Sequence, residues 1–172
     1  PSEHLRKKPL LVERGRFRPV TNVNIDMLDA AMKAFEAEDD VVVGETLPLM
    51  EITMRNLMRD GEVDLRDFIA RAEVLAATGH TVLISDYFEY YRLAAYLSRY
   101  TNRRIGLAMG LPSLAELFEE KYYSKLDGGI LESFGRLFKN KLKLYVYPKK
   151  DIETGELITI DQLNIEGPLR QL

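Results

Sequence analysis

The fold is decided by residues 81–110, which read TVLISDYFEYYRLAAYLSRYTNRRIGLAMG. This stretch opens with a continuous apolar run at 81–84 and closes with a second run at 105–109. Such runs are typical of strands that are buried on both faces of a parallel sheet. Between them, residues 87–100 carry apolar side chains almost all round, which predicts a buried helix. We therefore predict an α/β fold with a doubly wound, mostly parallel sheet and helices on both faces.

This strand–helix–strand unit is Rossmann-like, and from it we can predict which strand residues are buried. Short loops and right-handed crossovers make parallel pairing of the two runs the economical arrangement. We expect five of their residues to be almost fully buried in adjacent strands, namely Val82, Leu83, Ile84, Leu107 and Met109.

Upstream of this unit, the pattern predicts three helices and one short strand. Asn24 is a candidate N-cap for the first helix, and a short strand is expected at 41–43. Pro48 can open a second helix, and Asp64 caps a third helix that Gly79 ends. The expected inward faces are Ile25, Leu28, Met32 and Phe35; then Leu49, Ile52 and Leu57 with Met50, Met54 and Met58; then Leu65, Phe68, Ile69, Ala72, Leu75 and Ala76.

Downstream, the pattern predicts two more helices and an edge strand. One helix starts at 112–113, and another spans 130–138 with Ile130, Leu131, Phe134, Leu137 and Phe138 inward. Residues 141–147 alternate between polar or aromatic and aliphatic side chains, which indicates a half-exposed strand near a sheet edge. Smaller expected features are turns at 60–61, 127–129 and 151–155 and a short helix near 159–161.

The first 22 residues look different from the rest of the chain. Residues 1–22 are basic and contain Pro9, Gly15 and Pro19, which indicates an irregular connector. The alternative is an arm that contacts phosphate or an acidic partner. We expect a single α/β domain over 23–172, within a longer protein whose missing regions would be its partners.

The amino-acid composition restricts the kinds of catalytic and metal-binding site that the chain can form. The chain has no cysteine, which excludes disulfides, thiolate zinc sites and cysteine nucleophiles. Its only two histidines, His4 and His80, lie far apart in sequence, so a histidine-rich metal site or a Ser-His-Asp triad is disfavoured. A carboxylate site for magnesium stays open.

Net charge and hydropathy restrict the classes of partner that the protein is expected to bind. The net charge is −3, whereas a dedicated nucleic-acid binder usually carries a basic excess. No window of about 18 apolar residues is present, so no membrane helix is expected. We expect a cytoplasmic protein without a membrane or nucleic-acid partner, and homo-oligomerisation is left open.

Ligands of open α/β sheets bind beyond the carboxyl ends of the strands. One expected strand ends at Ser85, Asp86 and Tyr87, and the next leads through Gly110 to Ser113. Backbone N–H groups at a helix start can hold a phosphate, with a serine hydroxyl adding a hydrogen bond. A carboxylate at Asp86 would favour a magnesium-bound phosphate or a ribose hydroxyl. The alternative is that Ser85, Asp86 and Ser113 only cap helices.

A second candidate anion site lies further along the chain. Gly128 and Gly129 precede a helix that is followed by basic residues, among them Arg136 and Lys139. The alternative is a turn followed by a solvated basic face, with Arg136 and Lys139 pointing to solvent. Seven tyrosines could stack a ring or belong to the core: Tyr87, Tyr90, Tyr91, Tyr96, Tyr100, Tyr122 and Tyr123.

Residues 75–100, with Gly79, the run at 81–84 and the terminal Ser85, resemble the second motif of haloacid-dehalogenase-like phosphatases. The resemblance implies that a strand-end serine binds phosphate. The DxD nucleophile motif of that family has no counterpart in this chain. A P-loop and an intact GxGxxG are also missing.

A second resemblance covers more of the chain. The stretches at 17–21, 51–57 and 130–140 are similar to a bacterial family of larger uncharacterised cytosolic proteins, whose names conflict between TonB-dependent receptor and nicotinamide-mononucleotide adenylyltransferase. A membrane barrel disagrees with the helix-rich pattern. The adenylyltransferase name implies a nucleotide-binding α/β fold, although the HxGH motif that goes with it is absent.

The hypothesis that follows is a domain that binds a nucleotide or another phosphate-containing small molecule, with nucleotidyltransferase-like chemistry as one form of it. A non-catalytic assembly domain is the first alternative. A phosphatase whose nucleophile motif lies outside this chain is the second. Whether the protein is an enzyme is left open, and magnesium would enter with a phosphate ligand.

Overall fold

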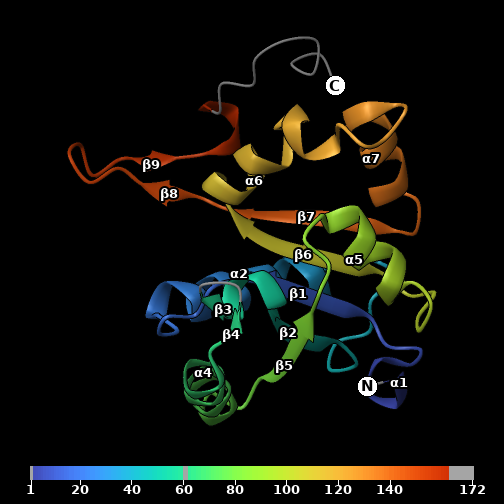
Figure 1. Cartoon of the computed structure of the whole chain (residues 1–172). Coiled ribbons are helices and arrows are strands. Elements are labelled where there is room, and N and C mark those ends of the chain that lie inside the picture. The colour runs from blue at the N-terminus through green and yellow to red at the C-terminus, as the bar shows by residue number, and fades with distance from the viewer. Residues whose placement is uncertain (1, 60–61, 163–172) are drawn as a thin grey trace.

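The computed structural model describes residues 2–59 and 62–162. Its centre is a five-stranded, all-parallel sheet in the order β5 (Thr81–Ser85), β2 (Leu47–Thr53), β1 (Leu10–Arg14), β6 (Ile105–Gly110) and β7 (Leu142–Tyr147). The chain adds β2 and β5 on one side of β1 and then returns to add β6 and β7 on the other (Figure 1). The strand order therefore reverses between β1 and β6, and the predicted doubly wound α/β fold is confirmed.

Helices cover both faces of this sheet. α5 (Tyr90–Leu97), α6 (Leu111–Leu117) and α7 (Gly129–Leu137) pack on one face, with α6 and α7 above β7 in Figure 1, and α1 (Ser2–Leu5) adds Leu5 to the same core. α2 (Asn22–Glu36), α3 (Met54–Leu57) and α4 (Leu65–Ala77) belong to the opposite face. α2 packs tightly on β6, because a Cβ added at Gly106 would lie 2.8 Å from the ring of Phe35.

The central strand comes from the segment that was expected to be an irregular connector. Residues 10–14 form β1, which pairs with β2 and β6, and Leu10, Leu11 and Val12 are fully buried. The expectation was wrong because the short apolar run stands among charged residues. Two of these, Glu13 and Arg14, belong to the strand itself.

β2 was also predicted incorrectly, as a helix opened by Pro48. The segment is a strand in which Met50 and Ile52 face α2, while Leu49 and Glu51 face the opposite side. This period-two alternation identifies a strand. The short strand expected at 41–43 is instead part of the loop that follows α2.

The two runs that decide the fold form β5 and β6, but they are not neighbours, because β2 and β1 lie between them. Leu107 and Met109 of β6 are buried as predicted. Val82 and Leu83 are only half-buried, and Ile84 is 39% exposed. The prediction failed for these three residues because β5 is the outermost strand of the sheet.

The helix boundaries follow their caps. Thr21, rather than Asn24, caps α2, and Asn24 returns the hydrogen bond as the third helical residue of a capping box. Asp64 caps α4 as predicted, with its carboxylate accepting from two backbone N–H groups. Gly79 follows the end of that helix with φ of +79°. Six apolar residues expected inward are exposed instead: Met58 after α3, Leu65, Ile69 and Ala76 on α4, and Leu131 and Phe138 at α7.

The remaining elements are short. β3 (Met58–Arg59) pairs with β4 (Glu62–Val63), η1 (Glu120–Tyr123) precedes α7, and η2 (Ile160–Gln162) follows the last strand. β8 (Lys149–Lys150) and β9 (Leu157–Ile158) form a hairpin that projects from the carboxyl end of β7 (Figure 1). The expected edge strand at 141–147 and the turn at 151–155 are thus observed, whereas the turn expected at 60–61 lies outside the described residues. None of the described helices is long and apolar enough to cross a membrane.

Candidate functional site

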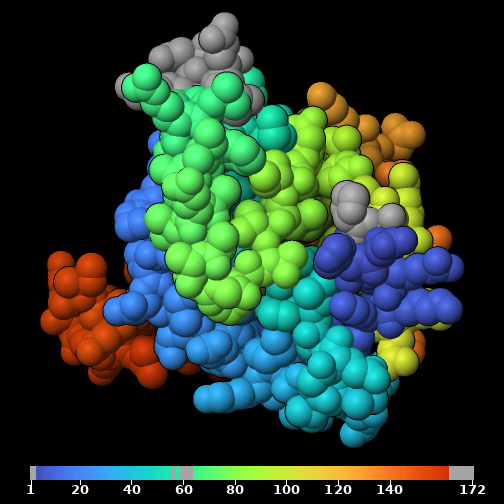
Figure 2. Space-filling model, turned by 90° about the horizontal axis from the view of Figure 1, so that it is seen from below, coloured from blue at the N-terminus to red at the C-terminus, as the bar shows by residue number. Residues whose placement is uncertain are grey.

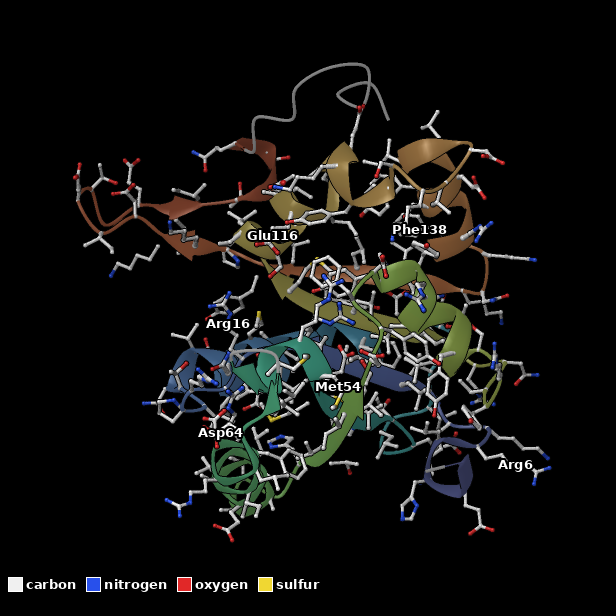
Figure 3. All side chains as sticks on the ribbon, viewed as in Figure 1. Arg6, Arg16, Met54, Asp64, Glu116 and Phe138 are labelled. Atoms are coloured by element: carbon white, nitrogen blue, oxygen red, sulfur yellow. The ribbon has the colours of Figure 1, made fainter. Side chains whose placement is uncertain are left out.

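A cavity of about 380 Å³ opens at the carboxyl edge of the sheet, where β1, β2 and β6 end. Arg14 and Thr53 close two of these strands, Ser113 stands in the helix after β6, and Phe88 follows β5. This is the place where the strand order reverses, and in open α/β sheets the crevice at that point holds the ligand. Figure 3 shows Arg16 and Glu116, both lining residues, on the side of the sheet where these strands end.

The floor of the site is a buried ionic network. Arg14 donates from Nε to Oε2 of Glu51 at 2.6 Å and from Nη2 to Oε1 at 2.9 Å. The two residues are paired in register on β1 and β2, so the strand pairing itself sets this bidentate geometry. Ser85, at the end of β5, donates its hydroxyl to the same carboxylate. Glu51 is fully buried, and these donors compensate its charge.

Arg14 also holds one wall of the cavity in place. Its guanidinium donates to the carbonyl of Tyr87 at 2.6 Å and to the carbonyl of Phe88. The same group lies over the ring of Tyr90, 4.4 Å from its centroid. One side chain therefore ties the end of β1 to the segment that leads from β5 into α5.

The other wall combines guanidinium groups with aromatic rings. Arg55 lies over the ring of Phe88, with 4.5 Å between guanidinium carbon and ring centroid. The rings of Phe88 and Tyr122 meet edge to face at 5.3 Å. Arg16 also lines the cavity and is exposed, so Arg16 and Arg55 are open to an incoming anion.

Two tyrosines of the cavity stay protonated at neutral pH. Burial raises the pKa of Tyr90 to about 12, and burial likewise raises the pKa of Tyr123 to about 12. Tyr123 already donates its hydroxyl to the carbonyl of Leu117 at 2.7 Å. The carboxylates that line the cavity are Glu89 and Glu116, and its lining cations are Arg16, Arg55 and Arg14, the last of which is paired with Glu51.

The residues predicted at the strand ends meet the cavity only in part. Ser113 lines it, and Gly110 ends β6 one residue before α6 begins. Ser85 lies beneath the wall, where its hydroxyl is bonded to Glu51, and Tyr87 contributes its carbonyl to Arg14. Asp86 is exposed and is not a lining residue.

The other predicted residues belong elsewhere. Gly128 and Gly129 stand at the start of α7, where the N–H of Gly128 is bonded to the Glu132 carboxylate at 2.9 Å. Arg136 and Lys139 are exposed as predicted, at the far end of the same helix. The structure therefore separates the glycines from the two cations that were expected to serve the same anion.

The sequence offered the basic segment 1–22 as a phosphate-contacting arm, but it did not place the candidate cations Arg14, Arg16 and Arg55 at the strand ends. Arg14, Arg16 and Arg55 follow the apolar segments of β1 and β2, and both segments had been interpreted as something other than strands. Residues 47–53 do not alternate in hydropathy, because Leu49 and Met50 are adjacent and β2 is buried on both faces, so the local pattern did not distinguish this strand from a helix. Once β2 is recognised, the sequence after each central strand places an arginine at the carboxyl edge of the sheet.

Within residues 2–59 and 62–162, no group of three or more acidic or histidine side chains is close enough to hold a metal ion. Magnesium that enters with a phosphate ligand therefore stays a prediction. Glu89 and Glu116 are the lining carboxylates that such an ion would meet.

Comparisons with protein-family models, with curated proteins and with solved structures find no match to this chain. The two resemblances described above stay expectations. A functional assignment therefore rests on the geometry of the cavity.

Proposed function

We propose that this domain binds a small ligand that carries a phosphate group and a planar ring, such as a nucleotide, in the cavity at the carboxyl ends of β1, β2 and β6. The observation that carries the proposal is the position of three arginines at the reversal of strand order. Dinucleotide- and mononucleotide-binding α/β folds use this crevice because helix starts and strand ends converge there.

Different side chains of the cavity suit different parts of such a ligand. Arg16 and Arg55 are the exposed guanidinium groups, which suit a phosphate because their planar donors can bind two oxygens at once. Phe88 and Tyr122 supply ring surface beside them. Ser113 and Tyr90 add hydroxyl donors.

Arg14 has a different role, because Glu51, Tyr87 and Phe88 already accept its hydrogen bonds. It is a positioning residue that holds the wall on which a ring would rest. Its removal would change the shape of the cavity as well as its charge.

A more specific version of the proposal is that the domain also catalyses transfer of a nucleotidyl group. The cavity supplies guanidinium groups for phosphate charge and the carboxylates of Glu89 and Glu116 for a phosphate-bound magnesium. The phosphatase alternative is weaker, because the segment after β1 reads Gly15-Arg16-Phe17 and offers no aspartate nucleophile.

The test is a calorimetric titration with nucleoside mono-, di- and triphosphates, with and without magnesium. Arg16→Ala and Arg55→Ala should each weaken binding by roughly tenfold, the value of one charged hydrogen bond. Arg66→Ala is the matched control, because Arg66 is exposed on α4 and does not line the cavity. Equal affinities in all four proteins, or no saturable binding by the parent, would refute the proposal.

Assembly is the second candidate, and one observation favours it. α4 continues its apolar surface beyond the sheet, with Leu65 66% exposed and Ile69 52% exposed one turn further on. Figure 2 shows α4 on the outside of the molecule, and the adjoining β5 is an edge strand with unpaired backbone groups along one side. Two copies could pair these edges about a two-fold axis. Light scattering should then report a dimer that Ile69→Glu converts to a monomer.

A further inference from the structure

A second hollow lies on the outside of the molecule, in the groove between α5 and α7, and it shares no lining residue with the strand-end cavity. Its volume is about 440 Å³. Four cations line it: Arg92 and Arg99 from α5 and the residues after it, and Arg136 and Lys139 from α7 and the residues after it. Three tyrosines, one alanine and one asparagine complete the lining.

The lining of this groove is positively charged, unlike the chain as a whole. The whole chain carries a net charge of −3, yet no aspartate or glutamate lines the groove. Every hydrogen-bonding side chain in the lining can donate a hydrogen bond. Like charges held together on two packed helices repel one another, and an anion between them would relieve that repulsion.

Two of the four cations have partners outside the groove. Arg92 pairs with Glu89 at 3.3 Å, and Arg136 pairs with Glu132. Both pairs are solvent-exposed, so each holds its arginine only weakly. For Arg99 and Lys139, no ion pair within 4 Å is found among residues 2–59 and 62–162.

Aromatic rings contact two of the four cations, Arg92 and Arg136. The guanidinium of Arg136 lies 5.8 Å from the centroid of Tyr91, across the packed α5–α7 pair. Arg92 lies 5.6 Å from the ring of Tyr87, and that ring packs against Tyr96 at 5.1 Å. Cations ordered on rings lose less freedom when they bind an anion than free surface lysines do.

We propose that this groove binds a ligand with at least two neighbouring phosphate groups, as a site separate from the strand-end cavity. Arg99 and Lys139 would take the phosphates from the two helices, with Arg92 and Arg136 at the rim. Free polyphosphorylated nucleotides and the backbone of single-stranded nucleic acid share this chemistry, and both also carry rings that tyrosines can stack.

The proposal is tested with two charge-reversal variants of equal net charge. Arg99→Glu with Lys139→Glu alters the groove, and Lys149→Glu with Lys150→Glu alters the exposed strand β8. Binding of sodium tripolyphosphate is measured by calorimetry at about 0.15 M salt, where distant charges are screened. We expect roughly a hundredfold loss of affinity in the groove variant, from two charged contacts, and no change in the β8 variant. Thermal melting checks that both variants fold.

Two results would overturn the proposal: no saturable binding by the parent, or equal losses in both reversal variants. The same titrations are repeated in an Arg16→Ala/Arg55→Ala background, in which the strand-end cavity has lost its two phosphate contacts. The loss of affinity in the groove variant should persist in that background. Titrations with a nucleoside triphosphate and with a short oligothymidylate then identify the source of the phosphates. Tighter binding of the oligonucleotide with a steep salt dependence assigns the groove to nucleic acid, and the reverse assigns it to the free nucleotide.

Discussion

Glu51 and Glu13 are both fully buried carboxylates on neighbouring strands, but they lie on opposite faces of the sheet. Glu51 accepts two hydrogen bonds from Arg14 and one from Ser85. Glu13 accepts one hydrogen bond, from the side chain of Asn24 at 3.1 Å, and its Oε2 has no partner among the described residues. Burial raises the pKa of Glu13 to about 7.

The difference shows what distinguishes the cavity side of the sheet. On that side, the sheet holds a charged network that orders the wall of the cavity through Arg14. On the α2 side, the sheet buries an acid with a single neutral donor, and the neutral form of the acid is favoured there. The two carboxylates should therefore respond differently to mutation and to pH.

The largest expected effect comes from Arg14→Met. This change leaves Glu51 buried without its cation and should lower the free energy of unfolding by about 3–5 kcal/mol. Urea denaturation measures the change. Replacing both residues, as Arg14→Met with Glu51→Leu, should recover most of the loss, because a buried ion pair is costly to break and cheap to replace. A double variant as unstable as the single one would contradict this account of Glu51.

The next effect is the pH dependence that Glu13 causes. In the unfolded chain its carboxyl ionises near its ordinary pKa of 4.5, and in the folded protein near 7. Between these values the unfolded state releases its proton first, so the free energy of unfolding falls as pH rises and levels off above about 7. The total loss should be roughly 3 kcal/mol. Glu13→Gln should flatten this part of the curve, which urea titrations from pH 4 to 8 would show.

A smaller effect is expected for Ser85→Ala, which removes one donor to Glu51 and leaves Arg14 in place. The expected loss is about 1–2 kcal/mol, the value of one hydrogen bond to a charged acceptor. Ligand affinity in the cavity should change little, because Ser85 does not line it. A large loss of affinity with unchanged stability would instead identify Ser85 as the phosphate contact that its strand-end position suggests.

The smallest effect is expected for Asn24→Ala. It removes the single donor to Glu13 and one half of the capping box of α2, with a cost of about 1 kcal/mol. The pKa of Glu13 should rise further, because the hydrogen bond from Asn24 opposes the effect of burial. The descending part of the pH–stability curve should then extend to higher pH, and an unchanged curve would mean that Asn24 does not support Glu13.

The sequence predicted the architecture from its most apolar segments. The runs at 81–84 and 105–109 were recognised as strands of one parallel sheet, and the alternating segment at 141–147 was recognised as an edge strand. The burial expected from the first run was wrong, because β5 is the outermost strand. β1 could not be found in the same way. Its last two residues, Glu13 and Arg14, are charged, and a local pattern treats charge as exposure.

The candidate site was predicted less well for the same reason. Ser113 was found because β6 was found, and it lines the cavity. Arg14, Arg16 and Arg55 depend on β1 and β2 being central strands, which is a property of the assembled sheet. The partners of Glu51 lie 37 and 34 residues away in sequence, so no local pattern could join them.

The central claim is that a nucleotide-like ligand binds at the reversal of strand order. The most direct measurement is a heteronuclear NMR titration of the isotopically labelled chain with a nucleoside monophosphate. We predict saturable shifts of the backbone amides of Gly15, Arg16, Thr53 and Ser113, with one dissociation constant common to all four. Shifts confined to other parts of the chain, or no saturable shift at any residue, would contradict the claim.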